Sequence, residues 1–184
     1  MKKYYLHITV WIGLLILAVI LFSTCNPKKG YDFEATYTED YNKVAKEYGD
    51  SSFYFYFAQA WLSEKVDEMD EKISVDSMMT LFQVGDTVIT FYHGDSLRVD
   101  KQVGQWCECM PIDLDSVCIP LTTALEDLRG MEITKPSSNL VVLRRPLYPP
   151  FDTYPYYMFG SVFDFLSNNL IILSSLDGHL VELD

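Results

Sequence analysis

The sequence predicts an α+β protein in which helices pack on an antiparallel sheet. Runs rich in β-branched and aromatic residues occur in both halves of the chain, which indicates strands. One amphipathic segment with helical spacing precedes each group of these runs. Two of the runs are interrupted by short turn sequences that contain glycine, as antiparallel hairpins are. We therefore expect one or two units, each with a helix on an antiparallel sheet.

The composition is that of a folded, acidic protein. The chain of 184 residues contains 13 Tyr and 11 Phe, enough aromatic side chains for a packed core, so disorder is not expected. The formal net charge is -12 at pH 7. Since an acidic surface repels phosphate groups, nucleic acid is not an expected partner.

The chain begins with a segment that resembles an export signal. Lys2 and Lys3 precede an almost wholly apolar run from Leu6 to Phe22. This run is slightly shorter than the about 20 residues that span a bilayer, so a retained membrane helix is an alternative. We assign residues 1–24 to a signal peptide or membrane anchor. The rest of the protein is then expected in the cell envelope, facing the periplasm or the exterior.

Residues 21–25, LFSTC, resemble the lipobox of bacterial lipoproteins. In that family, small residues precede a cysteine that is lipidated and becomes the new N-terminus, which implies lipidation at Cys25. Thr24 stands where Gly, Ala or Ser is usual in that family. Besides lipidation and a retained membrane helix, ordinary signal cleavage is a third alternative. Pro27 and Gly30 disfavour a helix, so residues 25–36 are expected to form a flexible tether.

Residues 37–118 are expected to form a first α+β unit. A helix is predicted from Thr38, as its capping residue, to Gly49, because apolar residues recur between them at helical spacing. Alternating Phe and Tyr after Ser52 favour a strand, although the same run could begin a buried helix.

Two further segments belong to this first unit. The charged residues 64–79 are expected to form a solvated loop or helix face rather than a metal site. Residues 86–100 are predicted to form a hairpin with its turn at residues 93–95. The histidine in this turn, His93, is expected to be solvated.

Residues 119–184 are expected to form a second unit with the same order of elements. A helix is predicted after Pro120, ending at Gly130, and a β-rich run follows at residues 138–148. Residues 170–183 are predicted to form a closing hairpin with Asp177 and Gly178 at its turn. The two helices and the two hairpin turns are separated by the same interval, which indicates an internal repeat.

The second unit resembles the PepSY and PepSY-like domains of exported bacterial proteins. The resemblance lies in IPLTTALEDLRGM, YPYYMFGSVF and LIILSSLDGHLVEL, where Asp177 and Gly178 stand in place of the family's Asp-x-x-Gly turn. It covers residues 119–184, and also residues 31–110 if the repeat holds. The resemblance implies a non-enzymatic domain that binds other envelope proteins and is sometimes protease-inhibitory. It also implies a tandem arrangement similar to that of β-lactamase inhibitors.

Three cysteines of the mature chain could carry chemistry. Cys107, Cys109 and Cys118 lie close together in sequence, and Cys118 could form a disulfide with either of the others. Buried free thiols and a metal or redox site are the alternatives, although a fourth metal ligand is missing nearby. No cofactor or metal is expected.

A proline-rich aromatic segment, residues 144–159, is the expected contact surface for a protein partner. Tyr and Arg are enriched in binding hot spots, and four prolines stiffen this segment. The alternative is that its rings fold back and cap the sheet. The candidate contact residues are Arg144, Arg145, Tyr148, Phe151, Tyr154, Tyr156 and Tyr157.

The leading functional hypothesis is a non-catalytic, exported, membrane-anchored protein that binds another envelope or secreted protein. A thiol-dependent or hydrolytic enzyme that uses Cys107, Cys109 or Cys118 is the main alternative. A purely structural lipoprotein, or an accessory subunit of a membrane complex, is a third. The sequence has neither a Gly-x-Ser-x-Gly turn nor a glycine-rich phosphate loop to favour an enzyme.

Overall fold

The computed structural model describes residues 30–49, 52–63, 74–130, 139–149, 151–161 and 170–181. The predicted signal or anchor at residues 1–24 and the predicted lipidation at Cys25 lie outside these residues. Over the described residues, none of the helices combines the length and the apolar character that crossing a bilayer requires.

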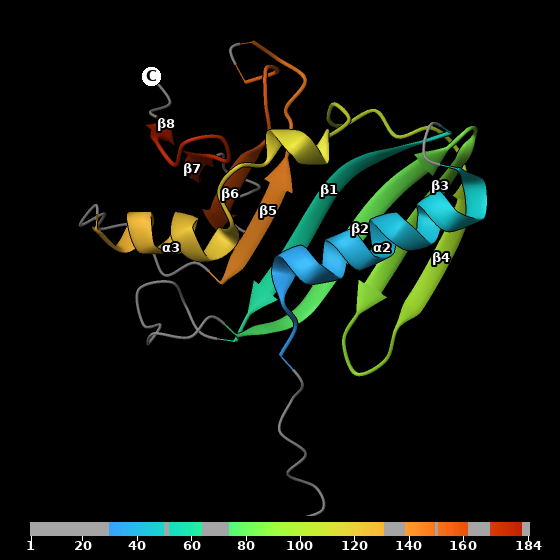
Figure 1. The fold of residues 1–184 in the computed structure, drawn as a ribbon, viewed down its shortest axis with the longest axis horizontal. Helices are drawn as coiled ribbons and strands as arrows, with labels where there is room; N and C mark the ends of the chain where they lie inside the picture. The colour runs from blue at the N-terminus through green and yellow to red at the C-terminus, as the bar shows by residue number, and fades with distance from the viewer. Residues whose placement is uncertain are drawn as a thin grey trace, which may run out of the picture.

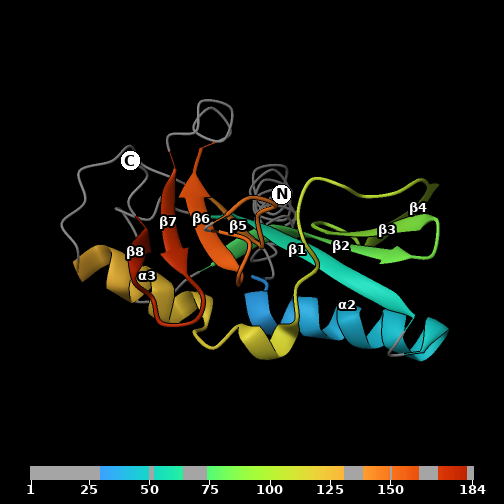
Figure 2. The same cartoon turned by 90° about the horizontal axis from the view of Figure 1, so that it is seen from above.

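The described residues form an α+β fold, as the sequence predicted. One antiparallel sheet of eight strands, in the order β4-β3-β2-β1-β5-β6-β7-β8, carries α2 and α3 on the same face (Figure 1, Figure 2). The elements are α2 (Phe33–Tyr48), β1 (Phe53–Leu62), β2 (Val75–Val84), β3 (Thr87–His93), β4 (Arg98–Val103), the 3-10 turn η1 (Leu114–Ser116), α3 (Leu121–Gly130), β5 (Leu140–Arg144), β6 (Tyr156–Gly160), β7 (Ile171–Ser174) and β8 (Leu180–Val181).

The order of a helix followed by four strands occurs twice within the described part of the chain. The first unit contains α2 and β1 to β4, and the second contains α3 and β5 to β8. β1 and β5 pair antiparallel in the middle of the sheet, with Gln59 opposite Val142. The repeat of element order predicted from the sequence is therefore present, and the two units share one continuous sheet.

Helix α2 begins earlier than the sequence predicted. Asp32 precedes the helix in an extended conformation, and its side chain accepts a hydrogen bond of 2.8 Å from the backbone N–H of Ala35. The prediction of a cap at Thr38 was wrong because Phe33 and Tyr37 already lie in the core. Residues 33–36, which were assigned to the tether, are helical.

A bulge in β1 decides which of its side chains face the helices. The register with β2 shifts between Phe55 and Phe57, so Tyr56 is an extra residue. Phe53 and Phe55 pack in the main core under the helices. Beyond the bulge, the alternation of side chains between the two faces of the sheet is reversed. Phe57 therefore lies on the face opposite Phe53 and Phe55, in a second cluster.

Strand β2 corrects one prediction. The segment at residues 64–79 was expected to be a solvated loop or helix face, but residues 75–84 form a strand, and residues 64–73 lie outside the described ones. Val75 and Met78 are buried in the main core. The charged composition hid this strand, because its first apolar residues are separated by the polar Asp76 and Ser77.

The remaining predicted elements of the second unit are confirmed within the described residues. Helix α3 ends at Gly130 and buries Leu121, Leu125 and Leu128. The closing hairpin turns at Gly178, whose φ of +75° is a conformation that favours glycine.

The two units are joined by a polar contact between their helices. The backbone N–H of Leu121, at the start of α3, donates to the Glu34 carboxylate of α2 over 2.6 Å. A carboxylate at a helix N-terminus is electrostatically favourable. Burial nevertheless raises the pKa of Glu34. Within the second unit, the Tyr157 hydroxyl of β6 donates to the Ile119 carbonyl just before α3 over 2.8 Å.

Candidate functional site

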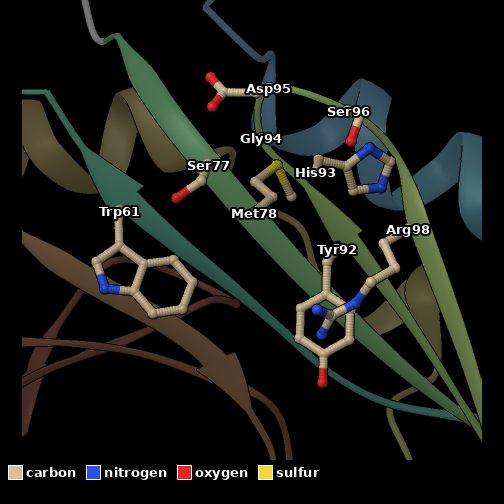
Figure 3. A pocket seen from close by; sticks show the side chains of 9 residues that line it. All are labelled: Trp61, Ser77, Met78, Tyr92, His93, Gly94, Asp95, Ser96 and Arg98. Carbon is tan, nitrogen blue, oxygen red and sulfur yellow. The ribbon is translucent and has the colours of Figure 1, made fainter.

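A pocket of about 320 Å³ opens at one end of β2 and β3, beside the loop that joins β3 to β4 (Figure 3). This volume is at the lower end of the range of about 300–1,000 Å³ that small-molecule sites have. The pocket is lined by Trp61, Ser77, Met78, Tyr92, His93, Gly94, Asp95, Ser96 and Arg98.

Sheet register brings Trp61 and Tyr92 to this pocket. Trp61 pairs with Ser77, and Tyr92 pairs with Met79, so all four residues share one face of the sheet. This is the face opposite the helices, because the neighbouring Met78 lies in the main core. Trp61 reaches it only because of the bulge at Tyr56, since uninterrupted alternation from Phe53 would direct the indole into the core.

The rim of the pocket carries charges of both signs. The Arg98 guanidinium lies 4.3 Å from the centre of the Tyr92 ring, a cation–π contact. Arg98 also forms an ion pair of 3.2 Å with Asp100. Asp95 adds an exposed carboxylate from the loop. The positive charge of Arg98 is therefore already balanced within the protein.

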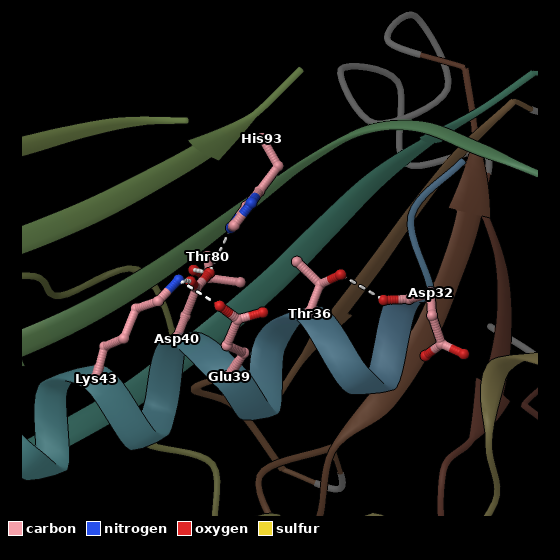
Figure 4. A network of polar contacts seen from close by, with 7 residues as sticks. All are labelled: Asp32, Thr36, Glu39, Asp40, Lys43, Thr80 and His93. Carbon is pink, nitrogen blue, oxygen red and sulfur yellow. Dashed lines mark hydrogen bonds and ion pairs between the residues drawn. The ribbon is translucent and has the colours of Figure 1, made fainter. Parts of the chain in front are cut away.

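A buried polar network lies on the other face of the same strands (Figure 4). The Asp40 side chain of α2 is fully buried, and its Oδ2 atom lies 2.6 Å from Nε2 of His93. The Thr80 hydroxyl donates to the same oxygen over 2.8 Å. Because an ionised carboxylate only accepts hydrogen bonds, we assign His93 Nε2 as a donor. Lys43 completes the network from the surface, 3.4 Å from Oδ1.

This network fixes the loop beside the pocket. The Tyr31 ring packs edge-on against the His93 ring, with centroids 5.6 Å apart. The Tyr31 hydroxyl donates to the Gly94 carbonyl over 2.5 Å, and its backbone N–H donates to Val75 over 3.0 Å. The start of the loop is therefore held between the buried hydrogen bond from His93 to Asp40 and an anchored tyrosine.

Sequence reasoning missed this network. His93 was expected to be a solvated turn residue, but it is the last residue of β3 and only 8% exposed. The available signal was Asp40, which lies at helical spacing from Tyr37 and Val44 on the face that packs in the core. A carboxylate on such a face requires a buried partner.

The structure shows the three cysteines as free thiols, without the possible disulfide to Cys118. Cys107, Cys109 and Cys118 are all free thiols, of which only Cys109 is buried. The Trp106 indole N–H donates to the Cys109 sulfur over 3.3 Å, and burial raises the pKa of this thiol. Cys109 is therefore poorly suited to act as the nucleophile of a thiol enzyme. Among the described residues, no three His, Cys, Asp or Glu side chains are grouped so that they could hold a metal ion.

The proline-rich aromatic segment caps the sheet with most of its rings. Tyr156 and Tyr157 are buried in β6, so the prediction that these two contact a partner was wrong. Phe151 and Tyr154 pack against Tyr156, with ring centroids 5.7 and 5.1 Å away. Tyr148 is the aromatic residue of this predicted set that stays at the surface, 75% exposed.

The two arginines of this segment have partners within the protein. Arg144 Nε lies 3.0 Å from the sulfur of Met158 on the neighbouring strand. Arg145 donates to the Asp152 carbonyl over 2.6 Å and so fastens the segment. Both side chains are half-buried. Their geometry supports the capping alternative for this part of the segment.

Strand β4 is an exposed edge of the sheet (Figure 1). All of its six residues except Asp100 are exposed. The N–H of Gly104 donates to the Asp86 carbonyl of the β2–β3 turn over 2.7 Å. In an antiparallel ladder alternate residues bond to the neighbour, so Val99, Lys101 and Val103 direct their N–H groups away from β3.

Comparison with known proteins gives no family for this chain. No known protein family, no curated protein and no solved structure matches it. The pocket and the β4 edge meet at residues 94–98, and they are the two features from which a function can be inferred.

Proposed function

We propose that the protein is a non-catalytic, membrane-anchored binding module of the cell envelope. Its partner is another envelope or secreted protein, which contributes an extended segment that pairs with the edge strand β4. The membrane attachment is inferred from the apolar run and from Cys25 in the sequence. The single observation that carries the binding function is the open backbone of β4.

The exposed edge of β4 has the length and the chemistry of a strand-addition site. Such sites bind through main-chain hydrogen bonds, while side chains along the edge give specificity. β4 has six residues, close to the common length of strands, whereas the described part of β8 at the other edge has two. The outward N–H groups of Val99, Lys101 and Val103 are the donors for an added strand.

Apolar side chains along β4 favour an added strand over open solvent. Val103 is 85% exposed, and Val99 and Leu97 are also exposed. Natural proteins usually protect exposed edges with charges, and Lys101 is one such residue. The Lys101 ammonium group instead forms an ion pair of 2.9 Å with Glu47 of α2. The occupant we infer is therefore an extended segment with apolar residues that pack beside Val99 and Val103.

Photo-cross-linking in the producing cells tests this proposal. A photoreactive amino acid replaces Gln102, which is exposed on β4, and a matched control replaces Lys46, which is exposed on α2. We expect one discrete adduct from position 102 and none of that mass from position 46. The adduct identifies the partner by mass spectrometry.

A proline substitution separates edge pairing from simple proximity. Val99→Pro removes an outward N–H without removing a hydrogen bond to β3. Val99→Thr keeps the N–H and a β-branched side chain, so it is the matched control. The position 102 adduct should be lost with Val99→Pro and kept with Val99→Thr, both of which must retain the wild-type circular dichroism. Equal adducts from both variants would rule out pairing along β4.

A further inference from the structure

The pocket on the open face of the sheet is a slot flanked by two aromatic side chains, Trp61 and Tyr92. Trp61 on β1 and Tyr92 on β3 lie on the same face, with Ser77 of β2 between them (Figure 3). Strand spacing and residue rise place their Cα atoms roughly 12 Å apart. An atom in van der Waals contact with an aromatic face lies about 3.5–4.0 Å from it. This spacing leaves room for one ring-shaped molecule in contact with both side chains.

The walls of this slot carry side chains that can bind hydroxyl groups. Ser77 and Ser96 each offer a hydroxyl that donates and accepts, and Asp95 offers two carboxylate oxygens. These three side chains form no hydrogen bond to another described residue. The Arg98 guanidinium adds a planar set of N–H donors at the same rim.

The charges around the pocket favour a neutral ligand. Arg98 is already paired with Asp100 at 3.2 Å and stacked on Tyr92, so it offers little net attraction for an anion. Asp95 adds a negative charge at the rim, and the whole chain carries a formal charge of -12, which repels anions.

We propose that this pocket binds a neutral carbohydrate, with one sugar ring packed against Trp61 and in contact with Tyr92. The C–H groups of a sugar ring carry partial positive charge and pack favourably on the negative face of an aromatic ring. The hydroxyl groups at the edge of the same ring reach Ser77 and Asp95. Only a ligand with both an apolar face and several hydroxyl groups uses the aromatic and the polar walls together.

The site is held in shape before the ligand binds. The hydrogen bond from Tyr31 to the Gly94 carbonyl and the burial of His93 against Asp40 fix the loop that carries Asp95. A preformed site loses less conformational entropy on binding, which favours affinity from a small ligand. This inference does not depend on strand addition at β4, because Trp61 lies on β1, which β2 and β3 separate from that edge strand.

Tryptophan fluorescence and titration calorimetry test the proposal. The full chain is purified in a detergent without a sugar headgroup, because a maltoside would compete for the pocket. The probes are methyl glycosides of glucose, galactose, mannose and N-acetylglucosamine, with glucuronic acid as the anionic comparison. We expect saturable binding of at least one neutral glycoside, with a Kd on the order of 1 mM, and weaker binding of glucuronic acid.

Variants assign the binding to the slot. Trp61→Ala and, independently, Tyr92→Leu should each weaken binding by at least about tenfold, which is about 1.4 kcal/mol. Trp61→Phe keeps a flat ring and should retain part of the affinity. Trp106→Phe is the control, because Trp106 packs on Phe57 outside the pocket and its replacement should leave the Kd unchanged.

Three results would overturn the proposal. One is the absence of saturable binding for every neutral glycoside up to roughly 100 times the expected Kd, a concentration that would occupy nearly all sites. Another is binding that Trp61→Ala and Tyr92→Leu leave unchanged in proteins with wild-type circular dichroism. Stronger binding of glucuronic acid than of any neutral glycoside would also contradict it, because Arg98 would then act as an anion receptor.

Discussion

Removing Asp40 alone from its network with Thr80 and His93 should destabilise the protein more than replacing all three side chains by apolar ones. Asp40 is fully buried and accepts hydrogen bonds from Thr80 and His93 over 2.8 and 2.6 Å. Asp40→Ala leaves a buried hydroxyl and a buried imidazole without their common acceptor. Each buried donor that is left without an acceptor costs about 1–3 kcal/mol, so the two together should cost several kcal/mol.

Thr80→Val is the smallest perturbation of the same network. The valine has nearly the shape of threonine, so the change removes one hydrogen bond to a carboxylate and little packing. Such a bond contributes about 1.5–3 kcal/mol. Asp40 retains His93 at 2.6 Å and Lys43 at 3.4 Å, so the loss should stay within that range.

The triple variant Asp40→Leu, Thr80→Val and His93→Leu replaces the whole network by apolar side chains. Replacing all members of a buried polar network by apolar residues of similar shape is often neutral or stabilising. We therefore expect the triple variant to be more stable than Asp40→Ala alone, although its single costs would sum to several kcal/mol. The free energy of unfolding from urea titrations followed by circular dichroism measures all three variants.

Two outcomes would refute this reasoning. An Asp40→Ala cost below about 1 kcal/mol would mean that water replaces the lost acceptor and the site is not sealed. A triple variant that is no more stable than Asp40→Ala would mean that the three side chains do not act as one network. Val44→Ala serves as a packing control, since Val44 lies on the same helix face without a polar partner.

Three other predictions concern the rest of the fold. Burial raises the pKa of Glu34 above its ordinary 4.5. The free energy of unfolding should therefore fall as the pH rises from about 4.5 through the raised pKa. Glu34→Gln should abolish this fall, which urea titrations at several pH values would measure. In native protein, a maleimide should label Cys107 rapidly and Cys109 only after unfolding, as peptide mass mapping would show; rapid labelling of both would contradict the buried position. Gly178→Ala should cost about 1–3 kcal/mol, because its φ is +75° and a Cβ atom would lie 2.5 Å from an Asp127 oxygen; an unchanged urea midpoint would contradict this.

Local signals in the sequence were enough to predict the class and most of the elements. The alternation of Phe and Tyr after Ser52 predicted β1, and the glycine turn at Gly178 predicted the closing hairpin. The helical spacing of Leu121, Leu125 and Leu128 gave α3. These features depend on residues close in sequence, so periodicity and turn chemistry are sufficient to find them.

The site depended on contacts that no local pattern encodes. His93 and Asp40 meet because β3 lies under α2, and their separation in sequence is 53 residues. Trp61 faces the pocket because of one extra residue at Tyr56, which reverses the alternation that sequence reasoning follows. The aromatic segment that the sequence favoured for binding mostly covers the sheet, because its rings had an apolar face of the same protein to bury.

Amide hydrogen exchange of β4 tests the binding function most directly, once cross-linking has identified the partner. With the partner bound, the outward N–H groups of Val99, Lys101 and Val103 should exchange at least about tenfold more slowly, since each gains a hydrogen bond. The N–H group of Gln102 is already bonded to β3 and should change little. Unchanged exchange at all three outward positions, in a sample saturated with partner, would contradict strand addition as the function of this protein.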